Sequence, residues 1–111
     1  MISARLTPDT ALAALANSDD GKPFLRLFAH GSLEVEVYRP VGRDAQTPHT
    51  RDEIYVVIAG HGEFVNGGKR QSFQTGELLF VAAGVEHRFE NFSDDFSTWV
   101  MFYGPKGGEA A

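Results

Sequence analysis

The alternation of apolar and polar positions divides the chain into a short helical segment and a longer β-rich segment. Near the N-terminus, the apolar stretch ALAALA follows Thr7, Pro8 and Asp9. Threonine is a favourable N-cap, proline suits the first helical position, and an acidic residue stabilises the positive end of the helix dipole. The pattern predicts a helix that ends at the turn-forming cluster NSDDG of residues 17–21. Residues 1–22 are therefore interpreted as a helix and a linker.

Beyond residue 22, short runs of β-branched and aromatic residues recur between turn signals rich in glycine, proline and asparagine. Long helical connections are missing from this part of the sequence, which argues against a parallel βαβ arrangement. Eight strands are predicted, at residues 24–29, 33–38, 53–58, 63–66, 71–74, 78–81, 87–90 and 98–103. The pattern indicates an all-β sandwich or barrel over residues 23–104, followed by a flexible tail at residues 105–111.

The two faces of the predicted strands differ in polarity. Between residues 53 and 58, the even positions are all apolar, whereas the odd positions combine Glu53 with Tyr55 and Val57. A jelly roll would provide an interior for one face, and a second layer, the N-terminal helix or a partner subunit would cover the other. The strand at residues 98–103 repeats the pattern, so we expect a homodimer.

The composition narrows the classes of partner. The 111-residue chain has the size of one small domain. It carries 15 acidic and 10 basic residues, and its Lys and Arg residues are scattered, so a nucleic-acid partner is not expected. No apolar run approaches the ~20 residues needed to cross a bilayer, so a membrane partner is not expected either. The absence of cysteine and of an apolar secretory signal favours a cytoplasmic location.

Two histidines and a glutamate form the main candidate for chemistry. If the chain is extended near residue 50, positions of equal parity project to the same side, which places His49 beside Glu53. Another histidine, His87, begins a later β-like stretch. Two imidazoles and a carboxylate match the arrangement that leaves open positions on a ferrous ion, and the same donors suit zinc, manganese or nickel. The alternative is a hydrogen-bonded polar cluster that holds no metal.

The spacing of glycines around His87 resembles the second sequence motif of the cupin family. Gly76, Gly84, His87 and Asn91 occupy four positions of that motif, and Ala82 stands where the family has proline. Together with a matching first motif, this makes the chain similar to single-domain cupins over residues 33–103. The resemblance implies a cupin-type antiparallel double-sheet jelly-roll barrel with the short N-terminal helix added to it.

The first motif departs from the family pattern at one metal-binding position. His49, Glu53 and Gly60 match the later part of this motif, but Thr47 stands where the family has another histidine. Cupins normally hold a metal ion through three histidines and one glutamate. The resemblance therefore implies a divalent metal ion, iron, manganese, zinc or nickel, with His49, Glu53 and His87 as ligands. Gln46, Thr47, water or substrate would take the fourth place.

The cupin resemblance leaves the reaction open, because the family includes dioxygenases, isomerases, lyases, storage proteins and sugar-sensing domains. We expect a metal-dependent enzyme, an oxidoreductase if the ion is iron, that acts on a small organic molecule inside the barrel. Tyr55, Phe89 and Met101 are expected to line the pocket. Tyr38 and Tyr55 are candidate general bases only by residue type. The alternative is a non-catalytic cupin that binds a small ligand with weak or absent metal.

Overall fold

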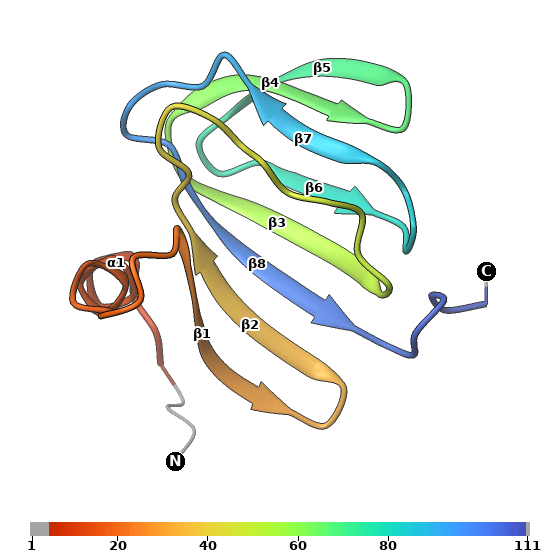
Figure 1. Cartoon of the computed structure of the whole chain (residues 1–111), viewed down its shortest axis with the longest axis horizontal. Helices are drawn as coiled ribbons and strands as arrows, with labels where there is room; N and C mark the ends of the chain where they lie inside the picture. Colours follow the sequence, from red (N-terminus) through yellow and green to blue (C-terminus); the bar gives the residue numbers. More distant parts are fainter. Residues whose placement is uncertain (1–4, 111) are drawn as a thin grey trace.

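The computed structural model describes residues 5–110, which form one helix and eight strands (Figure 1). The elements in chain order are α1 (Pro8–Ala16), β1 (Phe24–His30), β2 (Leu33–Tyr38), β3 (Asp52–Ala59), β4 (His61–Asn66), β5 (Lys69–Gln74), β6 (Leu78–Val81), β7 (His87–Glu90) and β8 (Ser97–Tyr103). Every strand expected from the sequence is present, with bounds that differ by no more than two residues.

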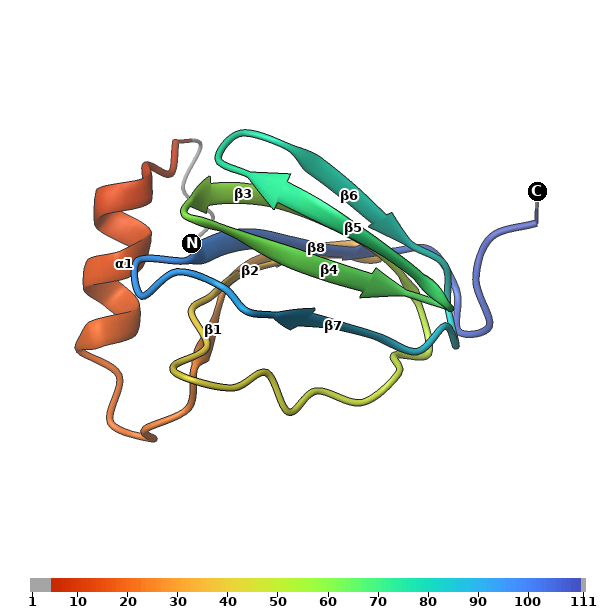
Figure 2. The ribbon, with the colours of Figure 1, turned by 90° about the horizontal axis from the view of Figure 1, so that it is seen from above.

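The strands form two antiparallel sheets that face each other (Figure 2). One sheet has five strands in the order β1-β2-β8-β3-β6, and the other has three in the order β5-β4-β7. The sheets remain two separate layers and do not close into a continuous barrel. The expected all-β, double-sheet jelly roll with a short N-terminal helix is confirmed.

An aromatic core joins the two sheets. The ring of Phe89, on β7, lies 4.9 Å from that of Tyr55, on β3, and 4.8 Å from that of Phe64, on β4, between centroids. Phe73 and Phe96 complete this cluster, and all five side chains are buried. Aromatic pairs in contact add to the stability that their buried area supplies. The core therefore fixes β3 against β7, the two strands that carry Glu53 and His87.

The helix forms as the sequence predicts and packs at one end of the larger sheet (Figure 1). Thr7 is the N-cap: its hydroxyl accepts a hydrogen bond from the Thr10 backbone amide at 3.1 Å. The Thr10 side chain in turn accepts one from the Thr7 amide, which completes a capping box. Ala11 is buried where α1 contacts β1 and β2. None of the helical segments within residues 5–110 could span a membrane.

Part of the segment expected to be a flexible tail bonds to the start of β3. The Gly107 amide donates to the Thr50 carbonyl at 2.7 Å, and the Glu109 amide donates to Asp52 Oδ2 at 2.7 Å. Asp52 Oδ1 accepts a further hydrogen bond from the Ala83 amide at 2.9 Å. Residues 107–109 and the loop between β6 and β7 thus meet at the residue that precedes Glu53.

The junction between β3 and β4 requires glycine. Gly60 has φ +100, and a Cβ there would lie 2.7 Å from Phe96 Cα. Gly62 faces a similar limit, since its Cβ would lie 2.7 Å from Phe92 Cα. The backbone after β7 therefore packs directly onto this junction, and a methyl group has no room there.

We expect Gly60→Ala to lower the free energy of unfolding by about 2 kcal/mol or more, because it combines an unfavourable φ with a clash against backbone. Urea denaturation would measure the change. Gly68→Ala is the matched control, since a Cβ at Gly68 meets nothing within 4 Å, and it should change stability by less than about 0.5 kcal/mol. Equal effects of both substitutions would contradict the close packing described here.

Candidate metal centre

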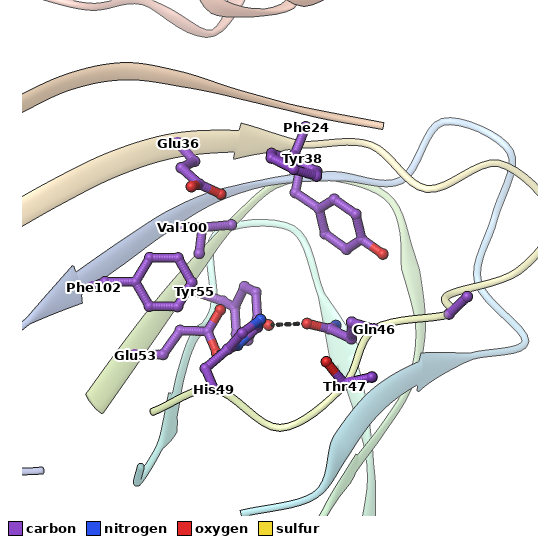
Figure 3. A pocket seen from close by; sticks show the side chains of 11 residues that line it. Phe24, Glu36, Tyr38, Gln46, Thr47, His49, Glu53, Tyr55, Val100 and Phe102 are labelled. Carbon is purple, nitrogen blue, oxygen red and sulfur yellow. Dashed lines mark hydrogen bonds and ion pairs between the residues drawn. The ribbon is translucent and has the colours of Figure 1, made fainter. Parts of the chain in front are cut away.

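His49, Glu53 and His87 lie together between the two sheets. Glu53 is on β3, His87 begins β7, and His49 lies in the segment that leads into β3. The three side chains offer ligand atoms that all lie within 4.8 Å of one another. Glu53 and His87 side chains are 1% exposed, and that of His49 is 31% exposed. Folding thus brings the three predicted ligands together, with His49 on the side open to a cavity (Figure 3).

One carboxylate oxygen of Glu53 is shared by the two imidazoles. Glu53 Oε1 lies 3.0 Å from His49 Nδ1 and 3.2 Å from His87 Nε2. The other oxygen, Oε2, is buried and has no hydrogen-bond partner among residues 5–110. A buried carboxylate oxygen without a partner is costly. A positive charge at this point would offset that cost.

His87 presents its Nε2 atom to the centre of the cluster. Its Nδ1 lies 2.8 Å from the Val85 carbonyl, which accepts a hydrogen bond from the ring and fixes the tautomer. Nε2 then faces two oxygen atoms, Glu53 Oε1 and Gln46 Oε1, the latter at 3.1 Å. A neutral imidazole would point its lone pair at both, so a proton on Nε2 or a shared cation must balance them. Imidazole nitrogen and carboxylate oxygen are donors that divalent transition ions accept, so the residues present fit such an ion.

A cavity of about 420 Å³ opens beside the cluster (Figure 3). Its lining combines the polar cluster with rings and aliphatic groups: Phe24, Glu36, Tyr38, Ala45, Gln46, Thr47, His49, Glu53, Tyr55, Val100 and Phe102. The size suits a small organic molecule, and the mixed lining is typical of a ligand pocket.

Comparison with known proteins agrees with this geometry. The family model described as the cupin domain matches residues 34–103, more than half of the chain. This chain belongs to the cupin family. It is 35% identical over 97 residues to the uncharacterized protein SCO3923 of Streptomyces coelicolor. The aligned region covers 86% of this chain and 91% of the relative.

Solved structures of other proteins show the same fold. A cupin-2 domain containing protein from Shewanella frigidimarina matches with a TM-score of 0.65 at 15% identity, over 89% of this chain and 95% of that chain. KdgF from Halomonas sp. matches with a TM-score of 0.66 at 16% identity, over 79% of this chain and 86% of that chain. At these identities the similarity concerns the fold alone.

Gln46 places its side-chain oxygen 3.1 Å from His87 Nε2. Its Nε2 donates to Asp44 Oδ2 at 2.7 Å, and its Oε1 accepts a hydrogen bond from the Tyr55 hydroxyl at 3.0 Å. Asp44 is in turn held by the Phe89 amide, at 2.8 Å, and by the Tyr38 hydroxyl. These bonds orient the amide so that its carbonyl oxygen points to the cluster. Thr47 also lines the cavity, without such a network among the described residues.

The pocket residues expected from the sequence are placed differently from one another. Tyr55 lines the cavity, whereas Phe89 is buried in the aromatic core. Met101 is not among the lining residues, because the register pairs it with Ile54 on the other face of the sheet. Val100 and Phe102, which pair with Tyr55 and Glu53, line the cavity instead. The expectation for Met101 is corrected by this one-residue difference in parity.

Glu36 and Phe24 are cavity residues that the sequence analysis did not single out. Glu36 lies on β2 and pairs with Val100, which in turn pairs with Tyr55, so all three share the inner face. Phe24 pairs with Tyr38 at the start of β1. The alternation in LEVEVY, residues 33–38, was the available signal, because it sets glutamates on the same face as Tyr38.

The electrostatics of the cluster favour the charged forms of Glu53 and His87. Burial alone would raise the pKa of Glu53, but hydrogen bonds and charge from His49 and His87 outweigh burial and lower it. Burial alone would lower the pKa of His87, but its bonds to Glu53 and Val85 and the nearby carboxylates raise it. Burial raises the pKa of Tyr55 and of Tyr38, with further increases from Glu53 and Asp44. Both tyrosines are therefore neutral donors near pH 7 and poor general bases there.

In the metal-free protein, the Glu53–His87 pair should make stability depend on pH. The raised pKa of His87 gives a contribution that is fully present below about pH 6.5, the ordinary histidine value, and lost as pH rises through the raised value. We expect the free energy of unfolding of the wild type, relative to Glu53→Gln, to fall as the pH rises above about 6.5 in EDTA. Urea denaturation would follow it. Asp94→Asn is the control: it removes an exposed carboxylate, so the difference in unfolding free energy between it and the wild type should not change with pH. A difference between the wild type and Glu53→Gln that does not change with pH would contradict the pairing of Glu53 with His87.

Proposed function

We propose that the protein is a metal-dependent cupin enzyme that acts on a small organic molecule in the cavity, by chemistry of the dioxygenase, isomerase or lyase type. The supporting observation is the buried carboxylate of Glu53, whose Oε1 faces two imidazole nitrogens while Oε2 has no partner among residues 5–110. Membership of the cupin family supports the same proposal.

The proposed ligand set is His49, Glu53 and His87, with the carbonyl oxygen of Gln46 in the fourth place. His49 Nδ1, His87 Nε2 and Glu53 Oε1 already lie close together, and Gln46 Oε1 is held 3.1 Å from His87 Nε2. An iron, manganese, zinc or nickel ion held there would supply Lewis acidity, and iron would also supply redox chemistry with dioxygen. A neutral amide oxygen binds transition ions more weakly than imidazole does, so the proposal includes a lower affinity than a complete histidine set would give.

The remaining cavity residues would bind and orient the substrate. Phe24, Val100 and Phe102 provide an apolar wall that excludes water from one side of a bound molecule. Tyr55 stays protonated because its pKa is raised, and its hydroxyl donates a hydrogen bond to Gln46 Oε1. It would therefore hold the amide oxygen in place and would not act as a base. Glu36 is the one carboxylate in the cavity lining outside the proposed ligand set.

Metal titration tests the proposal directly. Calorimetric titration of EDTA-treated protein with Mn²⁺ and Zn²⁺ should give one ion per chain in the wild type. Glu53→Gln should weaken binding by more than about a hundredfold, because loss of even an outer partner of a metal ligand costs ~10–100-fold. Elemental analysis after reconstitution gives the occupancy independently.

Neighbouring substitutions provide the control for the fourth ligand. Gln46→Ala should weaken Zn²⁺ binding by about tenfold, whereas Thr47→Ala should leave it within about twofold. A wild type that stays sub-stoichiometric after reconstitution would overturn the proposal. If that protein still bound small ligands in the cavity, the non-catalytic binding module would be the correct interpretation.

We also propose that the protein is a homodimer formed through the outer face of the larger sheet. Leu78 and Phe80, on the edge strand β6, are 62% and 47% exposed. They pair with Val56 and Ile54 of β3, which are only partly buried, so the four side chains form one apolar strip. Exposed apolar strips of this kind are typical of interfaces.

Light scattering after size exclusion should therefore give the mass of two 12.2 kDa chains at micromolar concentration. Phe80→Asp should shift the protein to the monomer, since it places a charge in the proposed interface. Val41→Asp is the control: Val41 is 86% exposed and lies outside the strip, so its substitution should leave the dimer intact. A monomeric wild type would refute the dimer without affecting the metal proposal.

A further inference from the structure

Glu36 is a charged residue of the cavity wall that the proposed metal site does not use. It lies on β2, and its side chain faces the cavity opposite the Glu53 cluster (Figure 3). Glu36 pairs with Val100 on β8, and Val100 pairs with Tyr55 on β3. Two strands therefore lie between Glu36 and the edge strand β6. A carboxylate in this position can contact a bound molecule directly.

No hydrogen bond or ion pair to Glu36 is found within residues 5–110, in contrast to its neighbour Glu34. Glu34 precedes it by two positions on the same face and binds Arg26 Nη1 at 2.8 Å and Arg51 Nη1 at 2.9 Å. Arg26 is the cross-strand partner of Glu36, but its guanidinium contacts Glu34. The two arginines close to this part of β2 therefore bind Glu34. The Glu36 carboxylate lines the cavity without such a partner among residues 5–110.

The described residues that line the cavity include two carboxylates and no lysine or arginine. Glu53 is paired with His49 and His87, whereas Glu36 has no such partner among residues 5–110. Burial, followed by repulsion from Glu34 and Glu53, raises the pKa of Glu36. The ionised carboxylate is thus held in an environment that disfavours its charge, and a positive group beside it would relieve this cost.

Aromatic rings line the same cavity as the Glu36 carboxylate. Phe24, Tyr38 and Phe102 line the cavity together with Glu36 (Figure 3). The faces of aromatic rings attract cations, and this attraction is stronger where water is excluded. An anionic ligand would meet a carboxylate and electron-rich rings here, whereas a cation would gain from both.

We propose that the cavity selects a small organic cation, an amine or quaternary ammonium compound, whose positive end lies against Glu36 and the surrounding rings. This inference rests on the proposed function, because it names the class of molecule that would reach the metal site from this cavity. The cation would lie at the β2 side, and its other end would face His49 and Gln46.

A matched pair of ligands tests this selectivity. Choline and the uncharged alcohol in which carbon replaces its nitrogen have the same shape and differ in charge. Metal-free protein at pH 7 and low ionic strength would be titrated with each, and backbone amide NMR signals would report binding. We expect choline to bind at least about tenfold more tightly than the alcohol. Metal-free protein is used so that neither hydroxyl group can bind an ion.

Variants of β2 identify the residue responsible. Glu36→Gln should reduce the preference for choline to within about twofold, and Glu36→Asp should retain most of it, because it keeps the charge. Asp94→Asn is the control, because it removes an exposed carboxylate outside the cavity lining and should keep the full preference. Thermal unfolding would verify that each variant is folded.

Each result decides between the proposals. Equal binding of both ligands, tighter binding of the alcohol, or no binding of choline up to roughly 10 mM would overturn the cation inference. A preference that survives Glu36→Gln would overturn the role of Glu36. Zn²⁺ titration of the same Glu36→Gln protein should match the wild type. Failure of Zn²⁺ binding in both proteins, with the choline preference intact, would refute the metal proposal alone.

Discussion

The contact between the Glu53 carboxylate and two imidazoles is the interaction on which the rest of the site depends. Glu53 belongs to the five-stranded sheet and His87 to the three-stranded sheet, so their 3.2 Å contact joins the two layers. Burying a carboxylate between sheets is unfavourable unless positive charge or hydrogen-bond donors surround it. The aromatic core around Phe89 holds the layers at the distance where this condition can be met.

A hydrogen-bond network behind the cluster orients the Gln46 side chain. Asp44 is buried and receives hydrogen bonds from Tyr38, Gln46 and the Phe89 amide. Asp44 accepts a hydrogen bond from Gln46 Nε2. This bond turns the other end of the amide, the carbonyl oxygen, toward the cluster. Such outer contacts set the orientation of the groups that face a bound ion. The orientation of Gln46 is therefore linked, through Asp44, to Tyr38 on β2 and Phe89 on β7.

The strands and the helix cap were predictable because each depends on local pattern, and the three clustered residues were predictable because their spacing resembles the cupin motifs. Alternation and turn residues define the strands, and Thr7 with Pro8 marks the helix start. Met101 was misplaced because the face of a strand depends on its register with neighbours, and one residue reverses it. Glu36 was missed because its role depends on what lies opposite and on which carboxylate the arginines contact. The orientation of Gln46 depends on Asp44, which is held by the Phe89 amide, and only tertiary folding brings Phe89 near these residues.

Residues 107–109 are connected by hydrogen bonds to the backbone and side chain that precede Glu53. Asp52 precedes Glu53 on β3. Its two carboxylate oxygens accept hydrogen bonds from the Ala83 amide and the Glu109 amide, so it links β3 to both of these segments. A shortened version ending before residue 107 would leave the Thr50 carbonyl and one oxygen of Asp52 without these donors. The residues that follow β8 therefore help to hold the backbone that positions Glu53.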